Sequence, residues 1–243
     1  IYVGLASIFN SKIVHYPMIT GLGGIYLSKD ENLISLFRYF FFFYLLKISL
    51  FKSKVIIFQN KYDQKLFKDK NIIKTKSALV PGSGVNIKNF TIAKFPKKIT
   101  FLMISRIIKY KGIENFISVA KQIKKINKNV RFFFIGKKQK SFSLNKNYLE
   151  KNINSHEIKF LNWGKKVNKH YSNCSVYVLP SKREGASRTI LEAMASGRPV
   201  IASNVPGCKQ LVKNGYNGYL VKYNNNFSLF SAINKFLNKP NLI

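Results

Sequence analysis

The feature of this sequence that most constrains its fold is an alternation, from residue 99 onward, of short apolar runs with amphipathic helical patterns. The runs with the length of buried strands are 99–105, 130–135, 158–161, 175–180 and 199–202. Helical spacing of apolar residues occurs at 112–126, 187–196 and 227–237. Strands that alternate with helices predict an α/β fold with a parallel sheet covered on both faces. Ligands of such sheets bind in the loops that follow the strands, so a site is expected there.

The N-terminal part of the chain follows a different pattern. A glycine-rich turn at 20–24 precedes a long apolar segment at 33–51. A loop rich in glycine and proline follows at 81–85, and a polar, lysine-rich stretch then leads to the strand at 99. We therefore place a domain boundary near residue 95, with a partial N-terminal domain at 1–94 and a second domain at 95–243.

The apolar segment 33–51 has the length of a membrane-spanning helix, but Arg38 and Lys47 interrupt it. The uncharged run between them is too short to cross a bilayer. The helical stripe that suits a domain core consists of Leu33, Leu36, Phe37, Phe40, Phe41, Tyr44, Leu45 and Ile48. The remaining face carries Tyr39, Phe42, Phe43 and Leu46 between basic residues. That second face is either buried as well or lies on a membrane surface.

The chain is strongly basic, with 42 Lys and Arg against 9 Asp and Glu and a formal net charge of +33. The lysines are scattered and Asn is abundant, which favours an AT-rich coding bias as the explanation. Attraction to an anionic membrane surface is the second interpretation, and no nucleic-acid partner is expected. Hydrophobic residues make up 46% of the sequence, which allows real cores and excludes a disordered tail.

The compartment is inferred from the ends and the cysteines of the chain. The sequence opens at Ile1 without a signal-peptide pattern, and we expect its N-terminus to be truncated. Cys174 and Cys208 lack metal-type spacing and are expected to be packing residues in a reducing cytoplasm.

The strongest chemical signal is the segment SKREGASRTILEAMASGRPV at 181–200. Glu184 falls in the loop after the strand at 175–180 and Glu192 inside the next helix, so both can face one ligand across the helix N-terminus. Backbone N–H groups at 185–188 can bind phosphate there, helped by the helix dipole. A carboxylate such as Glu192 can accept from two vicinal ribose hydroxyls. The alternative is a capping role for Glu184 and a solvated helix position for Glu192.

Arg106 and Lys111 give the second signal, in the segment SRIIKYKG at 105–112. They follow the strand that ends near residue 104, so they are expected at the carboxyl edge of the sheet. Two cations there suit a diphosphate, and they stabilise the negative charge that grows when a sugar–phosphate bond breaks. The alternative is two more solvated cations in a lysine-rich chain.

Together these motifs resemble glycosyltransferase family 4, which has the two-domain GT-B fold. Arg106 and Lys111 match that family's R-x4-K signature, and Glu184 and Glu192 match its E-x7-E signature. The surrounding matches are PGSGVN at 81–86, VPGC at 205–208 and NGYNG at 214–218. The resemblance covers 80–223 closely and 1–79 loosely. It is nearest to bacterial enzymes that add N-acetylgalactosamine or a related hexosamine to a lipid-diphosphate-linked sugar.

The resemblance implies a Rossmann-like donor domain without its final helix and the C-terminal remnant of a Rossmann-like acceptor-side domain. It implies a retaining transferase that takes a nucleotide sugar, expected to be a UDP-sugar, and a lipid-diphosphate or polysaccharide acceptor in surface-glycan synthesis. The implied catalytic residues are Arg106, Lys111 and Glu184. The implied donor-binding set is Arg106, Lys111, Gly136, Glu184, Gly185, Ala186, Ser187 and Glu192. No cofactor and no metal ion are expected, because the nucleotide sugar is a substrate.

The sequence departs from the family pattern in several places, and two of them bear directly on the site. After Gly136, the segment 137–139 replaces a second glycine that the family often has, so the contacts to the base stay open. None of His15, His156 and His170 occupies the place of the family's active-site His, and none is given a catalytic role. Because the acceptor-side domain is expected to be incomplete, this chain alone is expected to have little or no transferase activity.

The turn that contains Gly21, Gly23 and Gly24 is expected to face the cleft between the two domains, where contact with acceptor phosphate or donor sugar is a secondary possibility. The resemblance also implies a cytoplasmic protein that is either free or peripheral on the inner membrane.

Two other classes of function stay open. A GT-B sugar-nucleotide epimerase would need acidic and His catalytic groups in the cleft, which the sequence does not offer. A non-enzymatic basic module would bind polyanions or anionic lipid with strong salt dependence and no selectivity for a nucleotide sugar.

Overall fold

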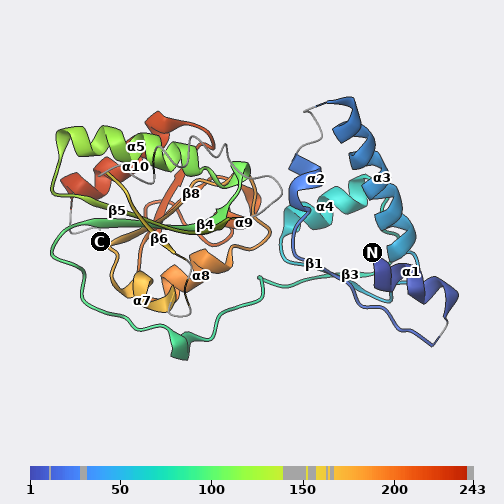
Figure 1. Cartoon of the computed structure of the whole chain (residues 1–243). Helices are drawn as coiled ribbons and strands as arrows, with labels where there is room; N and C mark the ends of the chain where they lie inside the picture. Colours follow the sequence, from blue (N-terminus) through green and yellow to red (C-terminus); the bar gives the residue numbers. More distant parts are fainter. Residues whose placement is uncertain are drawn as a thin grey trace. The chain divides into compact units, whose positions relative to one another are not determined.

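The computed structural model describes residues 1–10, 12–27, 32–138, 152, 157–162, 164 and 167–239. The chain forms two compact units, Ile1–Ser83 and Gly84–Ile243, and each has its own parallel sheet (Figure 1). The predictions made for Gln139 and His156 lie outside the described residues.

Unit 1 (Ile1–Ser83) combines a small sheet with helices. Its elements are α1 (Tyr2–Phe9), β1 (Met18–Ile19), α2 (Gly23–Leu27), α3 (Leu33–Leu50), β2 (Ile56–Phe58), α4 (Lys61–Asp69) and β3 (Ser77–Leu79). The strands are parallel in the order β1-β2-β3. The side chains of Asn32 and Asn60 accept backbone N–H groups at the starts of α3 and α4, which fixes where these helices begin.

The predicted core stripe of α3 is wrong, because the structure buries the other face. Tyr39, Phe43, Leu46 and Leu50 are buried in the core of unit 1, while the predicted stripe is largely exposed. Both faces of α3 are apolar, so spacing alone could not decide between them. Contacts made in three dimensions decide it: the Tyr39 and Phe43 rings pack together at a tilt of 57°, with centroids 4.7 Å apart.

The close approach of α1 to α3 adds to this choice of face. A Cβ atom added to Gly4 of α1 would lie 2.1 Å from the Ser49 carbonyl oxygen, so the two backbones touch there. Only glycine, which has no Cβ atom, allows such an approach. The α3 helix is also long and apolar enough to cross a membrane by length and composition, in spite of Arg38 and Lys47, and 33% of it is buried.

Unit 2 (Gly84–Ile243) is a doubly wound α/β domain. Its strands are β4 (Thr100–Ile107), β5 (Arg131–Lys138), β6 (Lys159–Asn162), β7 (Val176–Leu179), β8 (Val200–Ser203) and β9 (Gly218–Val221). Its helices are η1 (Ile87–Asn89), η2 (Lys109–Lys111), α5 (Ile113–Ile126), α7 (Val167–Ser172), α8 (Arg188–Ala195), α9 (Pro206–Lys209) and α10 (Asn226–Asn238). The order of the parallel strands is β6-β5-β4-β7-β8-β9. The predicted strands and helices of this region are confirmed, and β9, α7, α9 and the short helices η1 and η2 are additional elements.

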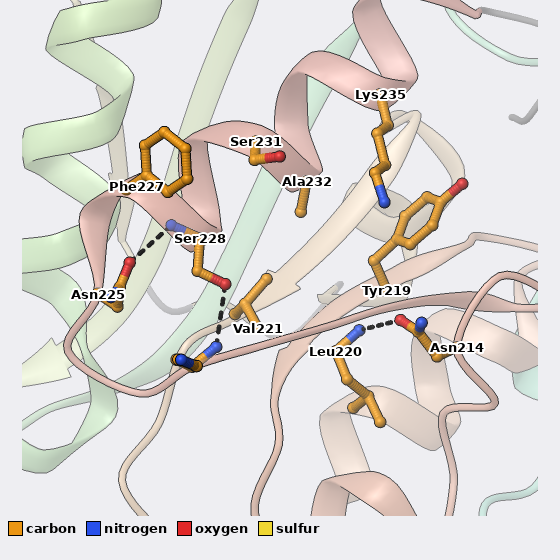
Figure 2. A pocket seen from close by; sticks show the side chains of 11 residues that line it. Asn214, Tyr219, Leu220, Val221, Asn225, Phe227, Ser228, Ser231, Ala232 and Lys235 are labelled. Atoms are coloured by element: carbon orange, nitrogen blue, oxygen red, sulfur yellow. Dashed lines mark hydrogen bonds between the residues drawn. The ribbon is translucent and has the colours of Figure 1, made fainter.

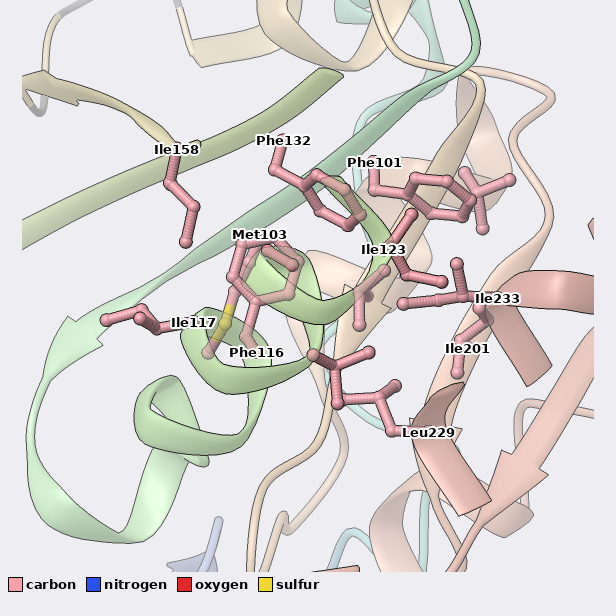
Figure 3. Packing of buried hydrophobic residues seen from close by; sticks show 14 of the residues in the cluster. Phe101, Met103, Phe116, Ile117, Ile123, Phe132, Ile158, Ile201, Leu229 and Ile233 are labelled. Atoms are coloured by element: carbon pink, nitrogen blue, oxygen red, sulfur yellow. The ribbon is translucent and has the colours of Figure 1, made fainter. Parts of the chain in front are cut away.

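The sheet of unit 2 separates two apolar cores because successive residues of a strand point to opposite faces. In β4, Phe101 and Met103 pack with α5 and α10 on one face, as Figure 3 shows. Leu102 and Ile104 belong to the cluster on the other face, with residues of α7, α8 and α9. The strands are buried on both sides, which explains why they are continuous apolar runs.

The boundary between the units falls before Gly84 and not near residue 95 as predicted. The predicted boundary assigned residues 84–94 to the N-terminal domain, yet this segment is attached to unit 2. The carbonyl oxygen of Asn89 accepts from the Asn168 side chain at 2.8 Å, and that of Ala93 accepts from Arg198 at 2.7 Å. Phe90 packs against the cluster that contains α7. These contacts are made by backbone carbonyls and one aromatic ring, which composition does not reveal.

Candidate donor-binding site

The strand order of unit 2 defines where a ligand is expected. Along the sheet, the chain connections reverse direction between β4 and β7, which makes this the topological switch point. In open parallel sheets, ligands bind at the carboxyl ends of the strands on either side of this point. Lys111 follows β4 and Glu184 follows β7, so the two predicted motifs come from the two strands that flank the switch point.

Lys111 and Glu184 are in direct contact. The Lys111 Nζ lies 2.6 Å from the Glu184 Oε1, and the exposed fractions of the two side chains are 17% and 11%. The loops that carry them are joined by a hydrogen bond of 2.8 Å from the Lys182 backbone N–H to the Tyr110 carbonyl. The Lys182 ammonium also lies over the Tyr110 ring, 5.3 Å from its centre. The structure thus brings together Lys111 of the predicted basic pair and Glu184 of the predicted acidic pair.

Glycines make this meeting of loops possible. Gly112 has φ of 74°, and a Cβ atom there would lie 2.1 Å from the Pro180 carbonyl oxygen. Gly207 supports the loop from its other side, because a Cβ atom on it would lie 2.3 Å from the carbonyl oxygen of Glu184 and 2.5 Å from that of Gly185. A side chain at either position would push against backbone that cannot move away cheaply. The sequence flagged both segments as motifs but did not reveal these contacts.

Glu192 lies in α8 and is held by two side chains. Its Oε1 accepts from the Arg188 Nε at 3.0 Å, and its Oε2 accepts from the Tyr171 hydroxyl at 2.9 Å. Arg188 is one helical turn before Glu192, a spacing that sequence reasoning could have used. Tyr171 lies in α7, and no short-range signal connects it to Glu192. The side chain of Glu192 is 14% exposed, so its carboxylate is partly accessible to solvent.

The start of α8 lacks a side-chain cap, and anion binding there stays a prediction. Ser187 is the N-cap residue, but its side chain makes no capping bond to the helix. Its hydroxyl lies instead 3.1 Å from the Thr189 Oγ1. The first backbone N–H groups of α8 are therefore not capped by this side chain. Gly185 and Ala186 precede it in the loop between β7 and α8, so the predicted loop residues are contiguous with the helix start.

The remaining predicted donor residues lie on neighbouring strands. Arg106 is the penultimate residue of β4 and is exposed. Gly136 lies in β5 beside Ser105 of β4, and a Cβ atom on it would lie 2.6 Å from the Phe134 ring. The structure thus places Arg106 and Gly136 in the carboxyl halves of their strands. Neither residue is part of the ion pair between Lys111 and Glu184. Their roles in binding stay predictions.

The predicted cleft loop of unit 1 follows β1. Gly23 starts α2 and has φ of 64°, a conformation that favours glycine. Gly21 precedes it, and both lie at the carboxyl end of the small sheet together with Gln59 and Ser83. The Gln59 side-chain amide donates to the Ser83 hydroxyl at 2.9 Å. That these residues and Gly24 contact a donor or an acceptor stays a prediction.

A cavity of about 330 Å³ lies elsewhere in unit 2, between β9 and α10 (Figure 2). None of the predicted site residues lines it. Several of its polar groups bond one another: Asn225 accepts from the Ser228 N–H at 2.7 Å, and the Asn214 side chain accepts from the Leu220 N–H at 2.9 Å. These bonds cap α10 and close a turn, so we assign no ligand to this cavity.

The described residues contain no group of three or more His, Cys, Asp and Glu side chains that could hold a metal ion.

The Nδ1 atom of His15 lies 3.2 Å from the Ser53 hydroxyl oxygen. Burial lowers the pKa of His15, with a smaller contribution from the charged N-terminus. Burial also lowers the pKa of His170 in α7.

The doubly wound fold of unit 2, with a basic and an acidic motif at its switch point, agrees with the GT-B class of glycosyltransferases. The sequence profile of the family described as "Glycosyl transferases group 1" matches residues 85–242, which is more than half of the chain. The chain therefore belongs to this family of glycosyltransferases. The match begins where unit 2 begins.

Relatives and solved structures agree with this assignment. The chain is 26% identical over 247 residues to N,N'-diacetylbacillosaminyl-diphospho-undecaprenol alpha-1,3-N-acetylgalactosaminyltransferase of Campylobacter jejuni, with 93% of the chain and 62% of that protein covered. It is 27% identical over 195 residues to UDP-Gal:alpha-D-GlcNAc-diphosphoundecaprenol alpha-1,3-galactosyltransferase of Escherichia coli, with 74% and 50% covered. The chain thus spans less than two thirds of the length of these relatives.

The fold is shared with HepE of Anabaena, whose structure contains UDP-glucose. The TM-score is 0.80 at 18% sequence identity, and the match covers 99% of this chain and 67% of HepE. The predicted fold class, α/β of the GT-B type, is thus confirmed.

Proposed function

We propose that the protein transfers a sugar from a UDP-sugar to a lipid-diphosphate-linked or polysaccharide acceptor in bacterial surface-glycan synthesis, with retention of anomeric configuration. The observation that carries the proposal is the ion pair of Lys111 and Glu184 at the switch point. Glu192 lies in α8, the helix that follows the loop of Glu184. The names of two relatives and the UDP-glucose complex of HepE support this donor and acceptor chemistry.

The residues of unit 2 have distinct tasks in this proposal. Arg106 and Lys111 bind the donor diphosphate, Glu184 lies at the sugar, and Glu192 accepts from the ribose hydroxyls. Gly185, Ala186 and Ser187 offer backbone N–H groups at the start of α8, where the helix dipole favours an anion. Gly136 borders the nucleotide beside β4.

The transfer step exchanges one bond of the anomeric carbon for another. The bond from this carbon to the diphosphate oxygen breaks, and its electron pair stays on the leaving UDP. A bond to the acceptor hydroxyl oxygen forms on the same face of the sugar, and the hydroxyl proton passes to a phosphate oxygen. Negative charge grows on the diphosphate, so the cations stabilise the transition state more than the ground state. We propose that no metal ion or other cofactor takes part.

Calorimetry with UDP tests the donor site directly. Glu192→Ala and Arg106→Ala are each expected to weaken UDP binding about tenfold or more, because charge-assisted hydrogen bonds contribute about 1.5–3 kcal/mol. Arg131→Ala is the matched control, since Arg131 is exposed at the opposite, amino end of β5. If both site variants bind UDP as tightly as this control, the site assignment fails.

Further measurements separate the other classes of function. Release of an epimerised UDP-sugar without any acceptor would favour an epimerase. Salt-sensitive binding to polyanions without selectivity for UDP would favour a non-enzymatic basic module. Because the chain spans 62% or less of the two relatives, we also expect the 243-residue chain alone to have little or no transferase activity. Robust turnover by it would refute that expectation.

We further propose that the protein works in the cytoplasm, on an anionic membrane surface. The supporting observation is the exposed face of α3, where Phe37, Phe40, Phe41 and Tyr44 are all more than half exposed. The Phe37 and Phe41 rings are stacked with centroids 6.2 Å apart. The same helix carries Arg38 and Lys47, and the whole chain has a net charge of +33. An aromatic face beside cations suits the interface of an anionic bilayer, where a lipid-linked acceptor is held.

A further inference from the structure

The hydroxyl of Tyr171 is buried and committed to a single carboxylate. Tyr171 is 0% exposed, and its hydroxyl lies 2.9 Å from the Glu192 Oε2. Burial raises the pKa of this hydroxyl well above its usual range, with smaller contributions from Tyr177 and Glu192. The group therefore remains a hydrogen-bond donor throughout the physiological range.

The ring of Tyr171 is fixed from several directions. Its centre lies 5.6 Å from that of Tyr177 in the sheet and 6.1 Å from that of Phe90, which comes from the segment before β4. Its backbone carbonyl accepts from the Nε of the buried Arg198 at 3.1 Å. A side chain held this firmly can hold another in one orientation.

The two oxygens of Glu192 have different partners. Arg188, on the Oε1 side, has a side chain that is 72% exposed, so solvent competes for this contact. Tyr171, on the Oε2 side, is rigid and shielded from water. A carboxylate has about four lone-pair sites, so accepting from Tyr171 leaves others for a vicinal diol.

We propose that Tyr171 is a positioning residue for nucleotide recognition, whose hydroxyl orients the Glu192 carboxylate toward the two ribose hydroxyls. This inference rests on the proposed function, in which Glu192 binds the ribose. Tyr171 does not touch the nucleotide and acts through Glu192. Its loss therefore reduces the preference for a ribose with both hydroxyls and leaves the binding of the base and the diphosphate in place.

The test compares the Kd of UDP with the Kd of 2′,3′-dideoxy-UDP by calorimetry on the full 243-residue chain. In Tyr171→Phe, the preference for UDP is expected to fall about tenfold, which corresponds to about 1.4 kcal/mol. The Kd of dideoxy-UDP is expected to stay within about twofold of the parent value. Equal weakening of both nucleotides would show a merely structural role and overturn the inference, as would an unchanged preference.

Tyr177→Phe is the matched control. Tyr177 is also fully buried and packs against Tyr171, but its hydroxyl donates to the Ile104 carbonyl at 3.0 Å and not to Glu192. This variant is expected to lose stability and keep the preference for UDP. If Tyr177→Phe loses as much of the preference as Tyr171→Phe does, the cause is a general loosening of the core packing. That result would overturn the inference.

Glu192→Ala separates this inference from the proposed function. If Glu192→Ala loses the preference for UDP and Tyr171→Phe keeps it, only the positioning role fails. If Glu192→Ala keeps the preference, the ribose assignment fails with it. Should Tyr171→Phe not fold, Phe90→Leu loosens the packing of the ring and keeps the hydroxyl. That variant is expected to reduce the preference about twofold to threefold, and an unchanged preference would contradict the inference.

Discussion

The Lys111 Nζ lies 2.6 Å from the Glu184 Oε1, so a cation and a carboxylate that are 73 residues apart in the sequence form one ion pair. Both side chains are mostly buried. A diphosphate that binds Lys111 must therefore compete with Glu184, and a donor sugar that reaches Glu184 lies beside a cation already in place. The pair links the two ends of the proposed donor, the phosphate and the sugar.

Lys111→Met should weaken UDP binding about tenfold or more, because a charged partner of the phosphate is lost. It should also lower the free energy of unfolding by about 1–3 kcal/mol, since the mostly buried Glu184 side chain loses its hydrogen-bond partner. Calorimetry and urea denaturation measure the two effects. Lys109→Met, at an exposed cation of the same short helix η2, is the control. Equal UDP affinity in the two variants would contradict the prediction.

Gly207→Ala is expected to weaken binding of UDP and of a UDP-sugar about tenfold without unfolding the protein. A Cβ atom at this position would lie 2.3 Å from the Glu184 carbonyl oxygen, so the loop that carries Glu184 has to shift. A small displacement of a binding group reduces the affinity for the ligand, because the geometry of the contact is lost. Gly164→Ala is the control, because a Cβ atom there meets nothing within 4 Å. The prediction fails if both variants bind like the parent.

Arg198→Met should lower the free energy of unfolding of unit 2 by about 3 kcal/mol, since buried acceptors left without a donor cost about 1–3 kcal/mol each. The Arg198 guanidinium donates to the carbonyl oxygens of Ala93, Tyr171 and Ser172. It also stacks 4.4 Å from the centre of the Phe95 ring. Urea denaturation followed by circular dichroism measures the change. The exposed Arg131→Met is expected to stay within about 0.5 kcal/mol of the parent. A similarly small change in Arg198→Met would refute the stabilising role of the Arg198 hydrogen bonds.

Replacement of Phe37 and Phe41 by Glu should abolish sedimentation with vesicles of phosphatidylglycerol and phosphatidylethanolamine. The two stacked rings are exposed on α3, and charge in place of apolar area opposes insertion into an anionic interface. Phe227→Glu is the control, because Phe227 is 81% exposed but belongs to α10 of unit 2. Unchanged sedimentation of the double variant, or absence of binding by the parent, would exclude this face as the contact.

The buried thiols predict a loss of stability at high pH. Burial raises the pKa of Cys174 to about 12, and it raises the pKa of Cys208 as well. A folded-state pKa above the unfolded value means that the contribution is complete below pH of about 8.5 and is lost as the pH rises toward 12.

Comparison with Cys174→Ala isolates this effect from the titration of the many lysines. Between pH 8 and pH 11, the parent should lose about 3 kcal/mol more of its free energy of unfolding than the variant, at about 1.4 kcal/mol for each pH unit. Urea denaturation at several pH values measures the difference. A constant difference between parent and variant over this range would contradict the burial of the thiol.

The sequence by itself determined the architecture of unit 2 and the identity of the motif residues. The period of its apolar residues predicted the strands and helices, because a strand buried on both faces must be a continuous apolar run and a covering helix must be amphipathic. The spacing of Arg106 and Lys111, and of Glu184 and Glu192, placed them after strands and at a helix start. These are local properties, which a linear pattern records.

The tertiary structure decided what depends on contacts between distant segments. It chose the buried face of α3, where two apolar faces gave the pattern no basis for a choice. It attached the segment 84–94 to unit 2 through carbonyl oxygens that composition does not reveal. It set Tyr171 against Glu192 across 21 residues of sequence. In each case the deciding energy comes from close packing or a buried hydrogen bond, and both exist only once the chain has folded.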